Sequence, residues 1–308
     1  MPESVRVRVP AKINLSLGVG AERSDGFHEL ATVYQALSLF DFVDITDRRD
    51  GRGLKLRVAG KESATVPKGE GNLAWKAATA AGLAFGQPTD LSITIDKGIP
   101  VAAGMAGGSA DAAGVLLGVA TLWTRQGVAE ASRYELETLA AELGSDVPFS
   151  LIGGTAVGTG HGEQVVPAMT TGEFHWVLAL SDGQLATPKV YQTFDRLTAE
   201  IVGHPPVNAA VMRAVRTGDA VGLGAALHND LQSAAIAMMP TLSRLLELGP
   251  EHGALGSIVS GSGPTCGFLV ADQDAALELA VALSSSGLCR AVRRATGPVH
   301  GAMVVTPE

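Results

Sequence analysis

The feature that most constrains this chain is a run of small residues that leads directly into a helical pattern. Pro100-Val-Ala-Ala-Gly-Met-Ala-Gly-Gly-Ser109 precedes a segment with helical spacing over 110–123. The first N–H groups of a helix lack intrahelical partners and the helix dipole adds positive charge there, so this position can bind a phosphate. Gly104, Gly107 and Gly108 would let a polyphosphate approach the backbone. A plain connector between a strand and a buried helix is the competing interpretation.

Two better-known glycine motifs do not fit the sequence. A Walker A loop requires Gly-Lys-Ser or Gly-Lys-Thr where this chain has Gly108-Ser109-Ala110, without a lysine. Gly18-Val-Gly20 is followed by Ala-Glu-Arg23, so the third glycine of a Rossmann fingerprint is absent. If the loop binds phosphate, it therefore does so as part of another class of nucleotide-binding protein.

Composition excludes several kinds of partner. With 308 residues, 46% hydrophobic and 18% charged, the chain is long enough for two domains and typical of a globular enzyme. The net charge of −8 argues against general binding to nucleic acid or to an anionic membrane, and no apolar run reaches the roughly eighteen residues of a membrane helix. Cys266 and Cys289 form no zinc motif and are expected to be free thiols. We expect a cytoplasmic monomer or homodimer that binds a small molecule and neither nucleic acid nor membrane.

Strand and helix patterns alternate along the whole chain. The sequence predicts strands at 5–9, 13–19, 54–58, 91–95 and 176–180, and a strand, glycine turn and returning strand over 257–270. Helices are predicted at 72–85, 110–123, 207–216, 241–248 and 274–284. Ser132 and Glu135 form a capping box that opens a helix ending at Gly144, and Thr187 is predicted as an N-cap before Pro188. The break at Gly153-Gly154 divides the chain into domains 1–153 and 154–308.

Three separated segments resemble a known superfamily. Pro10-Ala-Lys-Ile-Asn-Leu15, the 100–111 loop and Val259-Ser-Gly-Ser-Gly-Pro-Thr265 are similar in type, order and spacing to the three motifs of the GHMP kinases. The resemblance covers almost the whole chain. It implies a two-domain α/β (α+β) fold with an ATP-binding N-terminal half, a smaller C-terminal half and an active site in the interdomain cleft. It also implies transfer of the γ-phosphoryl group of ATP to an alcohol.

Accessory stretches resemble one branch of this superfamily. Asp25-Gly-Phe-His28, Gly144-Ser-Asp-Val-Pro148 and Gly153-Gly154 are similar to the members that phosphorylate the 2-hydroxyl of a cytidine diphosphate derivative of methylerythritol, in the non-mevalonate route to isoprenoids. Kinases of mevalonate, homoserine or galactose share the phosphate loop and remain alternatives. A non-catalytic sensor on the same scaffold is a further alternative.

The resemblance assigns roles to individual residues. Lys12 and Asp146 match the catalytic pair. The positions that match ATP-binding residues are Asn72, Lys97, Pro100, Val101, Ala102, Ala103, Gly104, Met105, Ala106, Gly107, Gly108, Ser109 and Ala110. The positions that match substrate-binding residues are Asn14, Phe27, His28, Thr187 and Tyr191.

The residue types suit phosphoryl transfer to an alcohol. A carboxylate such as Asp146 can accept the hydroxyl proton, and the ammonium group of Lys12 can orient that carboxylate and stabilise the developing oxyanion. Outside this context, Asp146 would be read as a turn cap and Lys12 as a lysine at a strand end. Retention of both residues argues against the sensor interpretation.

Asp111 stands next to the predicted polyphosphate site, where its charge would repel the ligand. A Mg²⁺ ion between phosphates and protein oxygens would remove the conflict, with the Ser109 hydroxyl near the metal. Stabilisation of the helix N-terminus by Asp111 is the equally weighted alternative. Two departures from the superfamily pattern stand out. Residues 102, 103 and 106 are alanines where glycine is common, and Phe27 replaces the usual tyrosine.

Overall fold

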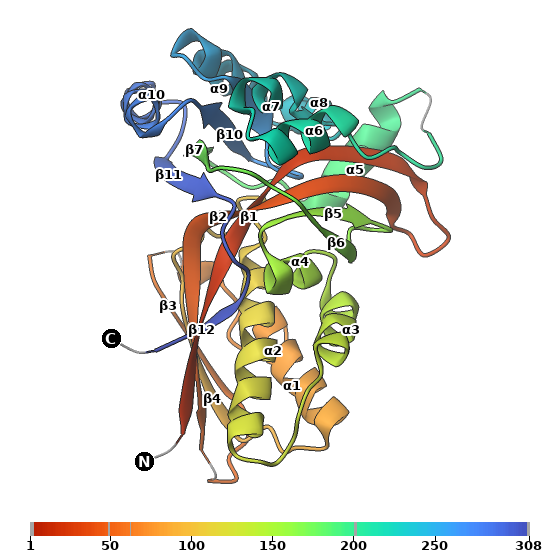
Figure 1. Ribbon diagram of the computed structural model, residues 1–308, viewed down its shortest axis with the longest axis vertical. Coiled ribbons are helices and arrows are strands. Elements are labelled where there is room, and N and C mark those ends of the chain that lie inside the picture. Colours follow the sequence, from red (N-terminus) through yellow and green to blue (C-terminus); the bar gives the residue numbers. More distant parts are fainter. Residues whose placement is uncertain (1–2, 49, 62, 200–201, 307–308) are drawn as a thin grey trace.

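The computed structural model describes residues 3–48, 50–61, 63–199 and 202–306 of the chain. It has the mixed α/β fold expected from the sequence, with two β-sheets and helices packed on both (Figure 1). The strands are β1 (Ser4–Glu22), β2 (His28–Asp47), β3 (Lys55–Ala59), β4 (Leu91–Asp96), β5 (Thr155–Thr159), β6 (Gln164–Ala168), β7 (Phe174–Leu180), β8 (His228–Asn229), β9 (Gly256–Val259), β10 (Thr265–Val270), β11 (Ala291–Gly297) and β12 (Met303–Val305).

The helices divide between the two sheets. Helices α1, α2 and α3 cover the lower sheet in Figure 1, and α6 to α10 lie around the upper one. The helices are α1 (Leu73–Phe85), α2 (Gly107–Arg125), α3 (Arg133–Leu143), α4 (Val147–Ile152), α5 (Thr187–Leu197), α6 (Ala209–Thr217), α7 (Ala220–Ala226), α8 (Gln232–Met238), α9 (Thr241–Glu251) and α10 (Gln273–Ser285), with a 3₁₀ turn at Ser63–Thr65. No helix within the described ranges is long and apolar enough to cross a membrane.

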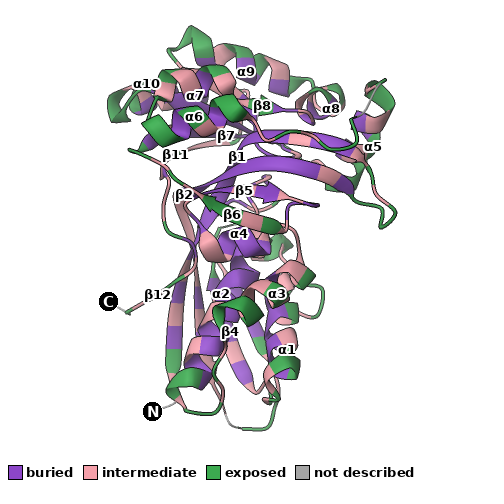
Figure 2. Cartoon of the chain, turned by 45° about the vertical axis from the view of Figure 1, so that its right-hand side comes forward, coloured by how far each residue is buried: buried purple, intermediate pink, exposed green. Residues whose placement is uncertain are grey.

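Two long antiparallel strands, β1 and β2, connect the lower and upper halves of the molecule (Figure 1). The sequence prediction of two separate strands at 5–9 and 13–19 is wrong, because β1 runs unbroken through both. Pro10 does not end the strand; it lies at a register shift between Pro10 and Ala11, where a bulge accommodates the missing N–H. Purple segments along both strands in Figure 2 mark their burial.

The larger sheet has the order β12-β1-β2-β4-β3, with β5 and β8 pairing to β2 and β1 and β6 pairing to β5. The smaller sheet has the order β11-β7-β10-β9. Segments after residue 153 therefore contribute to the larger sheet through β5, β6, β8 and β12. The predicted division into 1–153 and 154–308 stays a prediction, because sheet membership alone does not define a domain boundary.

Most predicted elements are confirmed within a few residues, including the capping box at Ser132 and Glu135. Two local predictions are wrong. Helix α2 begins at Gly107 rather than at Ala110, so the phosphate loop ends three residues earlier than expected. Thr187 is the first residue of α5 and not its N-cap, which is Ala186; the Thr187 hydroxyl instead contacts the Ser262 hydroxyl at 2.9 Å.

Glycines bring α2 against the larger sheet. A Cβ added at Gly114 would lie 2.7 Å from Val9 Cγ2, and one added at Gly118 would lie 2.1 Å from Ile45 Cδ1. Both distances are shorter than any real carbon contact, so the helix axis lies closer to the strands than side chains would permit. This packing fixes the N-terminus of α2, where the phosphate loop ends.

We expect Gly118→Ala to destabilise the fold by about 1–3 kcal/mol despite the better helix propensity of alanine, because the new methyl group overpacks against Ile45. Ile45→Val removes the colliding Cδ1 atom. In that background the same substitution should cost at least about 1 kcal/mol less, as measured by denaturant unfolding of all four proteins. Strictly additive free energies would contradict this account of the packing.

Candidate active site

The phosphate loop is held at several points by the rest of the fold. The backbone N–H of Lys12 donates to the carbonyl of Met105 at 3.3 Å, which joins the loop to β1. The Ser260 hydroxyl donates to the carbonyl of Gly104 at 3.1 Å. Gly104 has φ +69°, and a Cβ there would lie 2.4 Å from the Ser260 carbonyl oxygen. Glycine is therefore required at this position for both conformation and space.

Two alanines of the loop adopt backbone conformations that favour glycine. Ala102 has φ +53° and Ala106, at the N-cap position of α2, has φ +57°. Such conformations cost on the order of 1–3 kcal/mol each for a residue with a Cβ. The alanines therefore introduce strain at two points of the loop, and Ala106 does so where the loop turns into the helix. The surrounding contacts must hold this strain.

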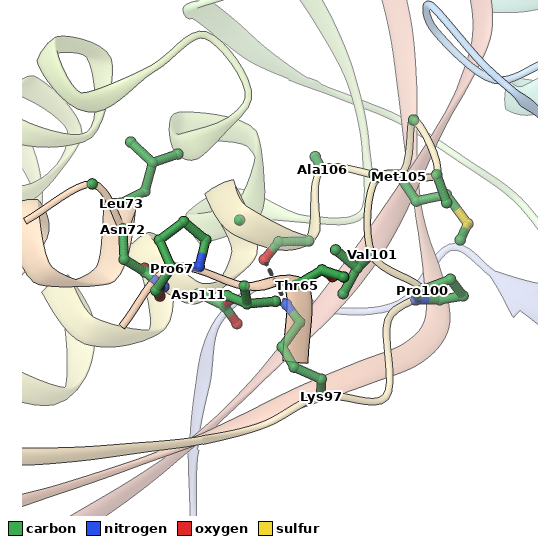
Figure 3. A pocket seen from close by; sticks show the side chains of 17 residues that line it. Thr65, Pro67, Asn72, Leu73, Lys97, Pro100, Val101, Met105, Ala106 and Asp111 are labelled. Atoms are coloured by element: carbon green, nitrogen blue, oxygen red, sulfur yellow. Dashed lines mark hydrogen bonds and ion pairs between the residues drawn. The ribbon is translucent and has the colours of Figure 1, made fainter. Parts of the chain in front are cut away.

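A pocket of about 350 Å³ opens beside this loop (Figure 3). Its lining residues are Thr65, Val66, Pro67, Gly71, Asn72, Leu73, Lys97, Asp111 and the loop residues 100–108. The structure thus brings together Asn72, Lys97 and residues 100–108 of the set predicted to bind ATP. Ser109 and Ala110 belong to the first turn of α2 and are not among the described lining residues.

Asn72 shapes the wall of this pocket opposite the loop. Its side-chain oxygen accepts from the backbone N–H of Ala74 at 2.8 Å, as the N-cap of α1, and its Nδ2 donates to the Pro67 carbonyl at 2.7 Å. Both ends of the amide are therefore engaged within the protein. Asn72 positions the 67–73 segment through these two bonds.

Lys97 lies in a buried group of charges. Its ammonium contacts Asp41 Oδ2, Asp111 Oδ2 at 2.8 Å and the carbonyl oxygen of Gly107 at 3.2 Å. Burial alone would lower the pKa of Lys97, but the two carboxylates raise it above its usual value. Asp41 Oδ1 also accepts from the N–H groups of Gly98 and Ile99. The group ties β2, the end of β4 and the start of α2 to one another.

The position of Asp111 resolves the electrostatic conflict noted in the sequence. Its carboxylate forms an ion pair with Lys97, so its negative charge is balanced without a Mg²⁺ ion and without the helix dipole. Burial raises the pKa of Asp111 well above its ordinary value, against the opposing effect of Lys97. Among the described residues its Oδ1 atom has no hydrogen-bond partner.

The side chains of Lys12 and Asp146 lie close to each other, next to the loop. Lys12 lies within β1, only 6% exposed, and its Nζ is 3.7 Å from Asp146 Oδ2 and donates to Asn14 Oδ1 at 2.7 Å. Asn14 in turn donates to the Thr32 hydroxyl at 2.8 Å. Lys12 therefore does not extend from a strand end into solvent. It is held by a chain of polar contacts from β1 to β2.

Asp146 stands at the N-cap position of α4, yet its carboxylate forms no capping hydrogen bond. The turn-cap interpretation of Asp146 is therefore not supported, and the carboxylate is available to another partner. It affects its surroundings electrostatically: burial first, and then the charge of Asp146, raise the pKa of the Tyr34 phenol well above its ordinary value.

The third motif reaches the same place. A Cβ added at Gly261 would lie 3.3 Å from both Asn14 Oδ1 and Lys12 Nζ. The Asn229 side chain donates to the carbonyls of Val259 and Gly261, at 2.8 Å each, and so holds the turn. All three sequence motifs therefore meet around Lys12.

Aromatic side chains form two pairs near the hairpin end of β1 and β2, one of them stacked and the other tilted. Phe27 is 54% exposed and stacks on His161 with ring centroids 4.8 Å apart. His28 is buried and packs against Tyr191 at 4.9 Å. The structure thus pairs His28 with Tyr191 among the predicted substrate residues.

Sequence reasoning missed several residues of the site. Asp41, Asn229, His161 and Asp195 lie in no recognised motif and reach it only through tertiary contacts. Only Asp41 carried a signal, as an acid directly between two phenylalanines, Phe40 and Phe42. No cluster of three or more metal-ligating side chains was found in the described part of the chain.

Comparison with known proteins gives one consistent answer. Residues 72–154 match the GHMP kinases N terminal domain and residues 211–288 match the GHMP kinases C terminal family. The chain is 50% identical to a 4-diphosphocytidyl-2-C-methyl-D-erythritol kinase from Rhodococcus jostii, over 99% of this chain and 96% of that one. It is 51% identical to the enzyme of the same name from Mycolicibacterium smegmatis, over 98% and 92%.

Solved structures agree with this assignment. A crystal structure of 4-(cytidine 5'-diphospho)-2C-methyl-D-erythritol kinase superposes with a TM-score of 0.72 at 30% identity, over 96% of this chain and 98% of that one. A homoserine kinase from Cytophaga hutchinsonii superposes with a TM-score of 0.77 over 99% and 98%, but at 17% identity it shows the fold alone. The chain belongs to the GHMP kinases and, within them, to the 4-diphosphocytidyl-2-C-methyl-D-erythritol kinase family.

Proposed function

We propose that this protein transfers the γ-phosphoryl group of ATP to the 2-hydroxyl of 4-diphosphocytidyl-2-C-methyl-D-erythritol, giving the 2-phosphate and ADP. The single observation that carries the chemistry is the buried Lys12 beside an uncapped Asp146, at the point where the three motifs meet. The names of relatives about half identical over nearly the full chain support the choice of substrate. The protein acts in the cytoplasm as a monomer or homodimer on this small molecule.

The reaction needs a proton acceptor and a fixed positive charge. The substrate hydroxyl oxygen attacks the γ-phosphorus as the bond from that phosphorus to the β,γ-bridging oxygen breaks, and ADP leaves with the bond electrons. Asp146 accepts the hydroxyl proton. Lys12, held by Asn14, orients the Asp146 carboxylate and stabilises charge on the reacting oxygens. Asn14 thus acts chiefly by positioning Lys12.

The 350 Å³ pocket binds the nucleotide. The adenosine part lies between the 65–73 segment and the loop, and the phosphates lie at the N-terminus of α2, where unpaired N–H groups and the helix dipole favour anions. Lys97 serves this site by holding the loop, since its ammonium is already bound by two carboxylates.

Magnesium would enter with the phosphates. The described residues offer no cluster of acidic ligands and Asp111 is engaged by Lys97, so the protein would contribute at most a hydroxyl such as that of Ser109. The ion would neutralise charge on the transferring group.

We expect Asp146→Asn to keep ATP affinity and to lower kcat by on the order of 10²–10⁴-fold, because the amide keeps the shape but cannot accept the proton. Steady-state kinetics with the purified protein, ATP, Mg²⁺ and the cytidine substrate, following ADP, test this. A kcat within a few-fold of the wild type would remove the general-base role.

For Lys12→Met we expect a loss of kcat that exceeds any rise in the KM for ATP, because the lost charge acts on the reacting oxygens. Lys55, an exposed lysine on β3 outside the proposed site, provides the control as Lys55→Met. If only the KM for ATP rose in Lys12→Met, the lysine would be a ground-state ligand of the nucleotide.

Substitutions at two glycines, Gly107 and Gly108, test separately whether this segment lines the nucleotide pocket and whether it supports the fold. A Cβ at Gly108 meets only Leu73 Cδ1, at 3.8 Å across the pocket, whereas one at Gly107 would lie 3.2 Å from Lys97 Nζ. Gly108→Val should therefore abolish ATP binding, by calorimetry, with little loss of stability, and Gly107→Val should also lower the melting temperature. Normal ATP binding by folded Gly108→Val would show that the loop is only a connector.

A further inference from the structure

His28 and Asp195 make a contact that the proposed phosphoryl transfer does not use. His28, the first residue of β2, is only 7% exposed, and its Nε2 lies 2.9 Å from Oδ1 of Asp195 on α5. The two residues are 167 positions apart in the chain, so the contact exists only in the folded protein. It joins the β1–β2 hairpin to α5.

The contact fixes which ring nitrogen carries the proton. An ionised carboxylate only accepts hydrogen bonds, so Nε2 of His28 must be the donor. In the neutral ring the other nitrogen, Nδ1, is then unprotonated and can only accept. Within the described part of the chain, no hydrogen bond involves Nδ1 of His28, so that acceptor is available to a ligand.

Aromatic neighbours hold the ring in one orientation. Tyr191 packs against it at a centroid distance of 4.9 Å, and Phe194 meets it edge-on at 6.4 Å. Tyr191 and Asp195 are four residues apart on α5 and therefore lie on one face of that helix. The same face of α5 therefore supplies the Tyr191 ring that packs on His28 and the Asp195 carboxylate that contacts Nε2. Together these two contacts fix the direction in which Nδ1 points.

An acceptor of fixed direction discriminates between nucleobases. Cytosine carries an amino group at position 4, a donor, where uracil carries a carbonyl oxygen, an acceptor. The lone pair of His28 Nδ1 would accept a hydrogen bond from the amino group of cytosine and would repel the carbonyl oxygen of uracil. A site built around one hydrogen bond rejects the analogue that lacks it far better than a stacking surface does.

We propose that Asp195 is a positioning residue that holds His28 as the Nε2–H tautomer and so makes the substrate site select cytosine over uracil. The inference rests on the proposed function, because it takes the cytidine diphosphate compound as the substrate. Asp195 does not touch the base and acts through the histidine ring.

The test compares wild type, Asp195→Asn and Asp195→Glu on the cytidine substrate and on its uridine counterpart. An asparagine amide can donate to Nε2 and so permits the other tautomer, in which Nδ1 carries the proton. We expect the ratio of kcat/KM for cytidine over uridine to fall about tenfold or more in Asp195→Asn, with the KM for ATP unchanged. Asp195→Glu keeps a carboxylate and should retain more of the ratio.

A second readout reports the tautomer directly. Nitrogen-15 NMR of the His28 ring should show Nε2–H in the wild type and a shift towards Nδ1–H in Asp195→Asn. A purely structural role for Asp195 would change the melting temperature and leave the tautomer and the base ratio unchanged. Because the wild-type spectrum alone reveals the tautomer, the test does not depend on folding of the variant.

The matched control is a second His–Asp pair with the same atoms in contact. His228 Nε2 lies 2.7 Å from Asp230 Oδ1, and its side chain is 59% exposed. Asp230→Asn should leave the base ratio unchanged. An Nδ1–H ring in the wild type, or an unaltered ratio in Asp195→Asn, would overturn the role of Asp195. A wild type inactive on the cytidine compound would instead overturn the proposed function.

Discussion

The pocket beside the loop depends on the contacts of the buried Lys97 ammonium group. A charge in the protein interior is costly unless it is paired, and removing one partner of a buried pair typically costs about 3–5 kcal/mol. Asp41 on β2, Asp111 on α2 and the Gly107 carbonyl therefore must stay close to Lys97 at the end of β4. These contacts hold β2, the end of β4 and the start of α2 together next to the loop.

This anchoring allows the loop to carry strain. Ala102 and Ala106 hold left-handed backbone conformations, which relax unless their surroundings prevent it. The loop is fixed at its helical end by Lys97 and at its middle by Lys12 and Ser260. Its N–H groups can therefore be oriented before a ligand arrives, so less ordering accompanies binding.

The same contacts connect the proposed nucleotide site to the proposed catalytic pair. Lys12 contributes its backbone N–H to the loop and its ammonium to Asp146, and its side chain is held by Asn14. One residue of β1 thus contacts both the phosphate loop and the proposed base. Gly261 lies in the turn between β9 and β10 of the smaller sheet and approaches the same Lys12 ammonium. A small displacement of β1 would therefore alter both functions together.

The sequence by itself determined the fold class, most helices, about half of the described strands and the three motifs, because periodicity, caps and glycine positions are local properties. The resemblance also pointed to Lys12 and Asp146, which the structure brings together, and to the loop residues that line the pocket. The sequence prediction erred where local signals are ambiguous: Pro10 in β1 resembles a strand end, and the small residues of the loop hide where α2 begins.

Only the tertiary structure decided which side chains contact one another. The resemblance matches Lys97 to an ATP-binding position, and only the tertiary structure shows that its buried ammonium is paired with Asp41 and Asp111 and so holds the loop. Asp195 carries no sequence signal at all, yet packing of α5 on the β1–β2 hairpin brings it to His28. The physical reason is that the cost of burying a charge or orienting a ring depends on neighbours that can lie far away in the sequence, which no local pattern records.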